Sequence, residues 1–239
     1  MSDRYIRQEM LLGKDAMEKL AHSHVAVFGI GGVGSWCAEA LARAGIGRLT
    51  LIDRDTVSRS NINRQVEALD KTVGMSKAEA MAKRLREIIP EIEAIPVTAH
   101  YEAEKRDRFF DKYDPYDYIV DAIDLVSCKI DLILTARERG IPMISALGTG
   151  NKLDASQLRI CDISKTEGCP LARVMRKELR NRGINHHTVV FSPELAVEAA
   201  QMEAPPPGRR SVPGSVVWVP ATAGLLMAQH VVTELIKDV

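Results

Sequence analysis

A glycine-rich segment early in the chain has the spacing that lets a backbone hold phosphate groups. It follows the pattern G-x-G-x-x-G, with glycines at Gly29, Gly31, Gly32 and Gly34. An apolar run at 25–28 precedes the segment, and apolar residues at helical spacing follow it. Between a strand and a helix, such a loop brings backbone amides and a helix N-terminus to phosphate oxygens. The loop predicts a nucleotide site and leaves open which nucleotide is bound.

Polar residues after the second predicted strand help to decide whether the nucleotide site serves hydride transfer or a reaction at phosphorus. Asp53 stands 19 residues past Gly34 and suits the ribose of either NAD or ATP. The residues that distinguish the two are Ser60, Asn61, Arg64, Gln65 and the helix-opening Lys77. Cations beside phosphates neutralise the charge that develops in a reaction at phosphorus, whereas hydride transfer needs little positive charge there. The pattern therefore favours ATP over NAD-dependent reduction.

Two acids, Asp121 and Asp124, end the fourth predicted strand in the sequence D-A-I-D. A carboxylate at that position can hold Mg²⁺ against phosphates. Asp121 can equally cap the helix that follows. Asp124 is therefore the predicted metal ligand, and it and Leu125 are predicted to contact the nucleotide.

The elements that must position these residues alternate between strand and helix. Strands are predicted at 24–28, 48–53, 93–97, 118–121 and 142–146, and helices near 33–43, 76–89, 104–110 and 126–139. Near-continuous apolar strands imply a sheet that is covered on both faces. The predicted fold class is α/β, a Rossmann-like doubly wound and mainly parallel sheet that binds ligands beyond the carboxyl ends of its strands.

The pattern changes after residue 150. Segments 157–162 and 188–191 predict strands that extend the sheet antiparallel to the rest, and 170–182 predicts a basic helix. Segment 203–214 holds four prolines and two glycines and predicts an exposed loop. A final buried helix is expected near 221–236. We expect one domain over 1–239, with an ATP-binding core at 1–150 and an extension at 151–239.

Composition narrows the possible partners. The 32 basic and 32 acidic side chains cancel, so any polyanion must bind at a local patch. The four cysteines form no C-x-x-C pair, which argues against structural zinc and against a disulfide framework. The N-terminus has no signal-like apolar core, and the apolar stretch 216–228 is too short to span a bilayer. We expect a soluble cytoplasmic protein without membrane partners.

As a set, these motifs resemble the ThiF/MoeB superfamily, which is related to the ubiquitin-activating enzymes. The resemblance rests on G-x-G-G-x-G, Asp53, N-x-N-R-Q, Lys77 and D-A-I-D, with R-Y-I-R-Q at 4–8. Enzymes of this family adenylate a carboxylate and release pyrophosphate. The resemblance implies that the glycines line ATP, that Asp53 binds the ribose, and that Asn61 and Arg64 contact the phosphates.

The resemblance also implies which residues neutralise the negative charge of the ATP phosphates during adenylation. Lys77 would stabilise charge at the α-phosphate, and Asp124 would bind Mg²⁺. Arg7 would reach the partner's ATP across a homodimer, so the predicted catalytic residues are Arg64, Lys77 and Arg7. Each residue has an alternative: Arg7 can pair with a surface acid, Asn61 can cap a short helix, and Lys77 can be solvated, although a cation at a helix N-terminus opposes the dipole.

Two substrate classes compete. One is the C-terminal glycine of a ubiquitin-like sulfur carrier, whose enzymes commonly carry the C-x-x-C pairs that this chain lacks. Cys169 is the candidate reactive cysteine for that class, and a small residue beside a helix start is its simpler interpretation. The other is a threonylcarbamoyladenosine in tRNA, because the region after residue 150 resembles the family branch that dehydrates it to the cyclic form. That resemblance includes D-I-S-K-T-E-G-C-P-L-A-R at 162–173 and V-V-F-S-P-E at 189–194.

Local positive charge offers modest support for RNA. The predicted tRNA-contacting residues are Arg173, Arg176, Lys177, Arg180, Arg209 and Arg210. The first four recur at three- and four-residue spacing on one helix face, although a solvated face is the ordinary explanation for such a run. A sulfur-transfer or cysteine-desulfurase-type partner, a monovalent-cation site and the general base stay open. A nucleotide-binding protein without catalysis ranks below an enzyme, because Arg64, Lys77 and Asp124 are all present.

Overall fold

A seven-stranded sheet organises the computed structural model, which describes residues 3–113, 115–200, 202 and 212–239. The strand order is β3-β2-β1-β4-β5-β7-β6. The strands are β1 His24–Phe28, β2 Arg48–Ile52, β3 Glu93–Val97, β4 Tyr118–Asp121, β5 Met143–Ala146, β6 Arg159–Asp162 and β7 Thr188–Phe191. The chain winds outward in both directions from neighbouring β1 and β4, so a switch point lies between their carboxyl ends.

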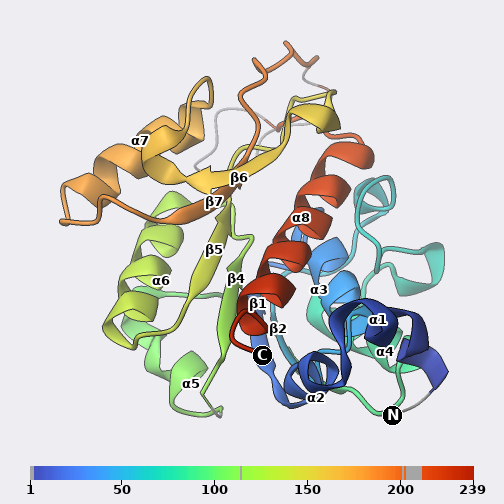
Figure 1. Ribbon diagram of the computed structural model, residues 1–239. Coiled ribbons are helices and arrows are strands. Elements are labelled where there is room, and N and C mark those ends of the chain that lie inside the picture. Colours follow the sequence, from blue (N-terminus) through green and yellow to red (C-terminus); the bar gives the residue numbers. More distant parts are fainter. Residues whose placement is uncertain (1–2, 114, 201, 203–211) are drawn as a thin grey trace.

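Helices cover both faces of the sheet (Figure 1). They are α1 Ile6–Leu12, α2 Lys14–His22, α3 Gly34–Arg43, α4 Lys77–Ile88, α5 Asp107–Phe110, α6 Val126–Glu138, α7 Pro170–Arg180 and α8 Trp218–Leu235. Successive side chains of a strand point to opposite faces. Val25 and Val27 of β1 therefore join a core with α3, α4 and α8, while Ala26 and Phe28 join one with α5, α6 and α7.

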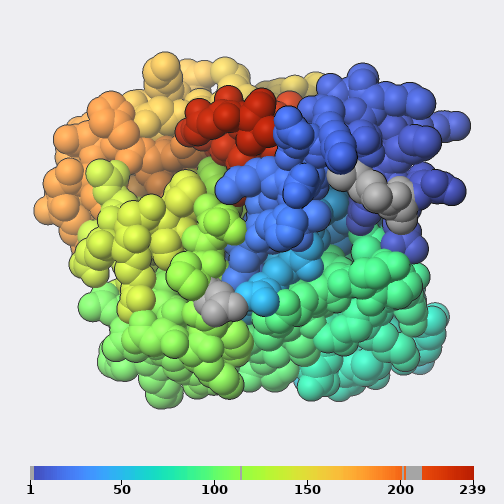
Figure 2. Space-filling model, turned by 60° about the horizontal axis from the view of Figure 1, so that its bottom comes forward, coloured from blue at the N-terminus to red at the C-terminus, as the bar shows by residue number. Residues whose placement is uncertain are grey.

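The late helix α8 lies against the start of α3. A Cβ on Gly224 would meet Cys37 N at 2.9 Å and would also meet Val33 O, so the helices touch through backbone. On the face shown in Figure 2, α8 (red) reaches the N-terminal segment (blue). The C-terminal extension therefore packs onto the glycine loop and shares the sheet with residues 1–150. Within the described part of the chain, no helix is long and apolar enough to cross a membrane.

The fold class is as predicted, with local differences. β7 pairs parallel to β5, so among the described strands the edge strand β6 alone runs antiparallel to the rest of the sheet, whereas the sequence predicts that both late strands do so. The helix expected near 104–110 is a 3₁₀ turn followed by the four-residue α5. α8 starts at Trp218, three residues before the predicted 221, because Pro220 falls in its first turn, where no N–H is needed. Of the proline-rich loop, residues 203–211 lie outside the described residues.

Candidate nucleotide-binding site

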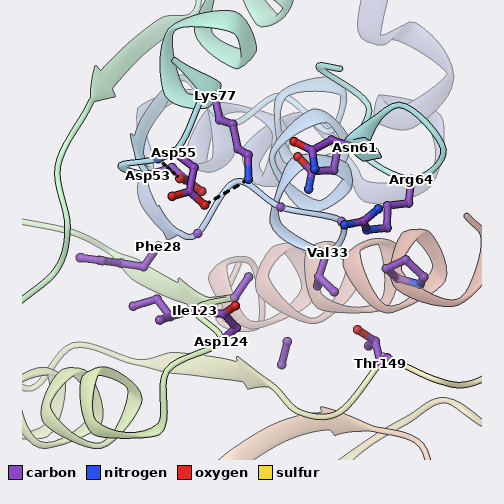
Figure 3. Close-up of a pocket in the computed structure, with 18 of the residues that line it drawn as sticks. Phe28, Val33, Asp53, Asp55, Asn61, Arg64, Lys77, Ile123, Asp124 and Thr149 are labelled. Atoms are coloured by element: carbon purple, nitrogen blue, oxygen red, sulfur yellow. Dashed lines mark hydrogen bonds and ion pairs between the residues drawn. The ribbon is translucent and has the colours of Figure 1, made fainter. Parts of the chain in front are cut away.

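A cavity of about 680 Å³ opens at the carboxyl ends of the central strands. Its volume suits a nucleotide-sized ligand. Figure 3 shows Phe28 and Ile123 at one end and Asn61 and Arg64 at the other. The predicted nucleotide residues that line it are Gly29, Gly31, Gly32, Asp53, Asn61, Arg64, Gln65, Lys77 and Asp124. The cavity therefore has an apolar end fit for a base and a polar end fit for phosphates.

Glycine is required in the loop at positions where backbone meets backbone. Gly29 has φ 91°, and a Cβ there would come 2.6 Å from Ala122 O. A Cβ on Gly34 would collide with Gly29 O, so Gly34 closes the turn behind the cavity and does not line it. Gly31 and Gly32 present their backbone to the cavity. The loop thus meets the requirement for close approach of a ligand's phosphates.

Asp53 braces the glycine loop as well as facing the cavity. Its Oδ2 accepts the Ile30 N–H at 2.7 Å, and its Oδ1 accepts the Asp55 N–H at 2.8 Å. Burial raises the pKa of Asp53, and the backbone donors oppose that rise. Each carboxylate oxygen keeps a second lone pair, so a ribose hydroxyl can donate to an acid that is already fixed in place.

The N-x-N-R-Q segment forms a short turn that presents polar groups to the cavity. Asn61 is buried, and its Oδ1 accepts the Ser58 N–H at 3.0 Å, which leaves Nδ2 as the donor of that amide. Arg64 Nη1 donates to Ser60 O at 2.7 Å and to Asn63 Oδ1 at 2.8 Å. The Asn61 side chain therefore caps the short turn with its oxygen and still lines the cavity with its NH₂ group, so the two interpretations are compatible. Ser60 is exposed and lies outside the lining.

Lys77 reaches the cavity from the first turn of α4. The residue is only 7% exposed, and its Nζ lies 3.4 Å from Asp55 Oδ2. Ser76 caps the helix by accepting the Glu79 N–H, so Lys77 is held at the helix start by local sequence. A nearly buried ammonium in this cavity does not fit the alternative of a solvated surface lysine. Asp55, its partner, was not among the predicted site residues.

The two acids of D-A-I-D have different surroundings. Asp121 is buried, its Oδ2 lies 2.9 Å from Lys129 Nζ, and its Oδ1 accepts the Ile123 N–H. Asp124 lines the cavity, while Leu125 lies outside the lining. The described residues hold no group of three or more His, Cys, Asp and Glu that could bind a metal alone. A single carboxylate fits Mg²⁺, which commonly takes one or two protein carboxylates and completes its shell with phosphates and water.

Residues of the C-terminal extension form one wall of the cavity. Asn151 has a positive φ of 57°, its Oδ1 accepts the Gly214 N–H, and its N–H donates to Gly214 O at 2.8 Å. Asn63 Nδ2 donates to Ser215 O at 2.9 Å. The segment around Gly214 is therefore tied both to the loop after β5 and to the N-x-N-R-Q turn. Sequence patterns gave no signal for this wall, because its residues are 63 to 152 positions apart from their partners.

The remaining predicted residues lie elsewhere. Arg7 is exposed on α1 and outside the cavity lining. Arg173, Lys177 and Arg180 are exposed on α7, whereas Arg176 is partly buried and donates to Thr166 O at 2.6 Å. Arg176 is thus bonded within the chain, which corrects its assignment to an exposed basic face. Arg209 and Arg210 lie outside the described residues.

Cys169 precedes α7 and is 5% exposed. A Cβ on Gly148, which lines the cavity, would meet the Cys169 sulfur at 2.5 Å. Its setting matches the interpretation as a small residue at a helix start.

Comparison with known proteins gives a match along the whole chain. The ThiF family model matches residues 5–238. A tRNA threonylcarbamoyladenosine dehydratase of Bacillus subtilis is 42% identical over 248 residues, covering 100% of this chain and 97% of that protein. The structure of E. coli tRNA N6-threonylcarbamoyladenosine dehydratase in complex with ATP matches with a TM-score of 0.88 at 36% identity, covering 99% of this chain and 97% of that one. A molybdopterin-synthase adenylyltransferase of Haemophilus influenzae is 35% identical over 59% of this chain and 58% of its own length.

Proposed function

The chain belongs to the ThiF family, and we propose that it is an ATP-dependent tRNA threonylcarbamoyladenosine dehydratase. The observation that carries this proposal is the extent of similarity: the dehydratases match over the full length, including the segments that wall the cavity. The similarity to the adenylyltransferase of the sulfur-carrier type covers 59% of the chain. This difference in coverage supports the dehydratase reaction, and a sulfur carrier is the weaker alternative.

The cavity supports ATP in one orientation. The base fits against Phe28 and Ile123, the ribose fits at Asp53, and the phosphates fit toward Asn61 and Arg64. Lys77 lies between the ribose end and the phosphate end, where the α-phosphate would be attacked. The homologous E. coli structure with ATP supports the same ligand here.

The proposed reaction has two steps. An oxygen of the threonyl carboxylate attacks the α-phosphorus of ATP, forming an acyl adenylate and releasing pyrophosphate. The ureido group of the same substrate then attacks the acyl carbon, loses its proton, and expels AMP to leave the cyclic product. Lys77 and Arg64 would neutralise charge that builds on the α-phosphate. Because nucleophile and acyl group share one molecule, closure is unimolecular, and no enzyme nucleophile is needed.

Asp124 would hold Mg²⁺ against the phosphates, where the ion would add positive charge as a Lewis acid. The donor set fits this role, since Asp124 offers a carboxylate to the cavity and the described residues form no complete metal cage. Structural zinc is not part of the proposal, because the sequence has no C-x-x-C pair.

A homodimer would complete the site through Arg7. On α1, Ile6, Met10 and Leu11 are 53%, 77% and 86% exposed, and an apolar helix face this open suits a covering partner. Arg7 sits on the same helix, outside the cavity of its own chain. We expect mixed dimers of Arg7→Ala and Lys77→Ala subunits to regain activity, since one hybrid site contains both residues. Proven heterodimers without activity would reject a shared site.

Three substrates separate the candidate functions. ATP consumption is measured with tRNA bearing threonylcarbamoyladenosine, with the same tRNA unmodified, and with a ubiquitin-like sulfur carrier. The proposal requires pyrophosphate and AMP with the first alone, and turnover with the carrier alone would overturn it. With heavy oxygen in the threonyl carboxylate, one labelled atom should appear in AMP. Label in inorganic phosphate with ADP as co-product would instead indicate phosphorylation.

A further inference from the structure

A buried carboxyl group lies close to the cationic end of the cavity but outside its lining. Glu67 is 1% exposed, and neither of its carboxylate oxygens has a hydrogen-bond partner within the described part of the chain. Its backbone is well held, because the Thr72 hydroxyl donates to Glu67 O at 2.8 Å. Buried polar groups are nearly always paired, and an unpaired buried carboxylate is costly. Such a group calls for a functional explanation.

The groups around Glu67 come from the elements that shape the phosphate end. Lys77 approaches from α4, Ser35 from the first turn of α3, and Asp53 from the end of β2. Burial raises the pKa of Glu67 to about 7. Its own backbone N–H, the charge of Lys77 and the Ser35 hydroxyl oppose the rise, and the charge of Asp53 adds to it. The protonation of Glu67 therefore depends on how close the positive charge of Lys77 lies.

Lys77 acts on Glu67 through its charge alone and forms its ion pair with a different acid. Its Nζ lies 3.4 Å from Asp55, whose side chain is 56% exposed. Entering phosphates would compete for the same ammonium and would bring negative charge of their own. Both changes make the surroundings of Glu67 more negative, and both favour its neutral form.

We propose that Glu67 is a positioning residue for Lys77 and that it takes up a proton when the nucleotide binds. As a carboxylate in the empty site, it draws the Lys77 ammonium toward the protein. As a neutral acid in the complex, it leaves that ammonium to the phosphates. The proton comes from solvent, and no covalent bond to carbon or phosphorus changes. This inference rests on the proposed binding of ATP.

Calorimetric titration with ATP in the absence of tRNA tests the inference. Binding heats measured at pH 7.5 in buffers of different ionisation enthalpy give the number of protons taken up. The proteins compared are the wild type, Glu67→Gln, and Glu79→Gln, which removes an exposed carboxyl from the first turn of α4. We expect wild type and Glu79→Gln to agree, and Glu67→Gln to take up about 0.3 to 0.7 fewer protons.

Equal proton counts for wild type and Glu67→Gln would overturn the inference while leaving ATP binding intact. Absence of saturable ATP binding in all three proteins would instead overturn the proposed function. Should Glu67→Gln not fold, ¹³C NMR of glutamate carboxyl groups in the wild type gives the answer directly. One carboxyl resonance with a midpoint near pH 7 must move to its acid position when ATP is added at pH 7.5, and a resonance that stays in place would overturn the proposal.

Discussion

Two buried lysines on opposite faces of the sheet are held in different ways. Lys129 of α6 lies 2.9 Å from Asp121, and both side chains are at most 1% exposed. Lys77 of α4 lies 3.4 Å from Asp55, whose side chain is 56% exposed. An enclosed pair loses much when broken, whereas a pair with an exposed partner can change partners at small cost. Both lysines are buried, so the difference lies in their acidic partners: Asp121 is enclosed with Lys129, whereas the exposed Asp55 leaves Lys77 able to bind a ligand.

The enclosed pair supports the cavity without lining it. Asp121 Oδ1 accepts the Ile123 N–H at 3.1 Å, and Ile123 and Asp124 both line the cavity. Beside this pair, Ser145 Oγ lies 2.8 Å from His187 Nε2, and burial lowers the pKa of His187 to about 4. This histidine is therefore neutral at physiological pH and adds no charge next to the ion pair.

Breaking the enclosed pair should give the largest effect. Lys129→Met leaves the Asp121 carboxylate buried and unpaired, so we expect the free energy of unfolding to fall by about 3–5 kcal/mol. The double variant Asp121→Asn with Lys129→Met removes both charges and should regain part of that loss. Urea denaturation of the two variants and the wild type measures this. A double variant no more stable than Lys129→Met would show that the buried charge is not the cause.

Removing the loosely held lysine should affect the reaction and not the fold. We expect Lys77→Ala to change the free energy of unfolding by less than about 1 kcal/mol and to slow adenylation by about 10²–10³-fold. Single-turnover pyrophosphate release with modified tRNA measures the rate, and Lys71→Ala, at an exposed lysine, is the matched control. A rate within a few-fold of the wild type would place Lys77 outside the reaction.

The cavity residues that the sequence predicts share a physical origin. Strand ends and helix starts carry local signals, so Asp53, Lys77 and Asp124 could be predicted from alternation of apolar runs and from single polar residues at their ends. Parallel strands then bring those ends to one edge of the sheet. The roles of these residues in binding and catalysis stay predictions, as does the organisation of the chain as one domain.

Residues that depend on tertiary contact carried no such signal. Glu67 is one acid among 32 in the sequence, and only its enclosure distinguishes it. Asn151 acts through its contact with Gly214, 63 positions away. Arg176 has the spacing of a basic face, yet the loop containing Thr166 folds back and binds it. Periodicity predicts which face of a helix a residue occupies and not which distant loop will cover it.

The buried acid predicts a pH dependence of stability. The pKa of Glu67 is about 7 in the folded protein and 4.5 for an ordinary glutamate, so the folded state binds the extra proton. Its stabilising contribution is complete below pH 4.5 and is lost as pH rises through 7. Relative to Glu67→Gln, the wild type should lose up to about 3 kcal/mol between pH 5 and 8. Parallel pH dependences for the two proteins in urea denaturation would contradict the shifted pKa.

Exposed cations form a third class beside the two buried lysines, because salt weakens their contacts far more than it weakens those of a buried lysine. Arg173 and Arg180 are exposed on α7, and Leu171 at the start of that helix lines the cavity. We expect Arg173→Ala with Arg180→Ala to weaken tRNA binding and to reduce the slope of log K against log salt by about 1.4–1.8, the value for two phosphate contacts.

The control for the arginine pair is Lys71→Ala with Lys83→Ala, which removes two exposed cations on or before α4, on the opposite face of the sheet. That double variant should leave the slope unchanged. Arg176→Ala should instead lower the free energy of unfolding by about 1–3 kcal/mol, because its bonds to Thr166 are internal. Filter binding across a range of salt concentrations measures the slopes. Equal slopes for the wild type and the Arg173/Arg180 variant would mean that α7 presents an ordinary solvated face, and that tRNA phosphates are bound elsewhere on the protein.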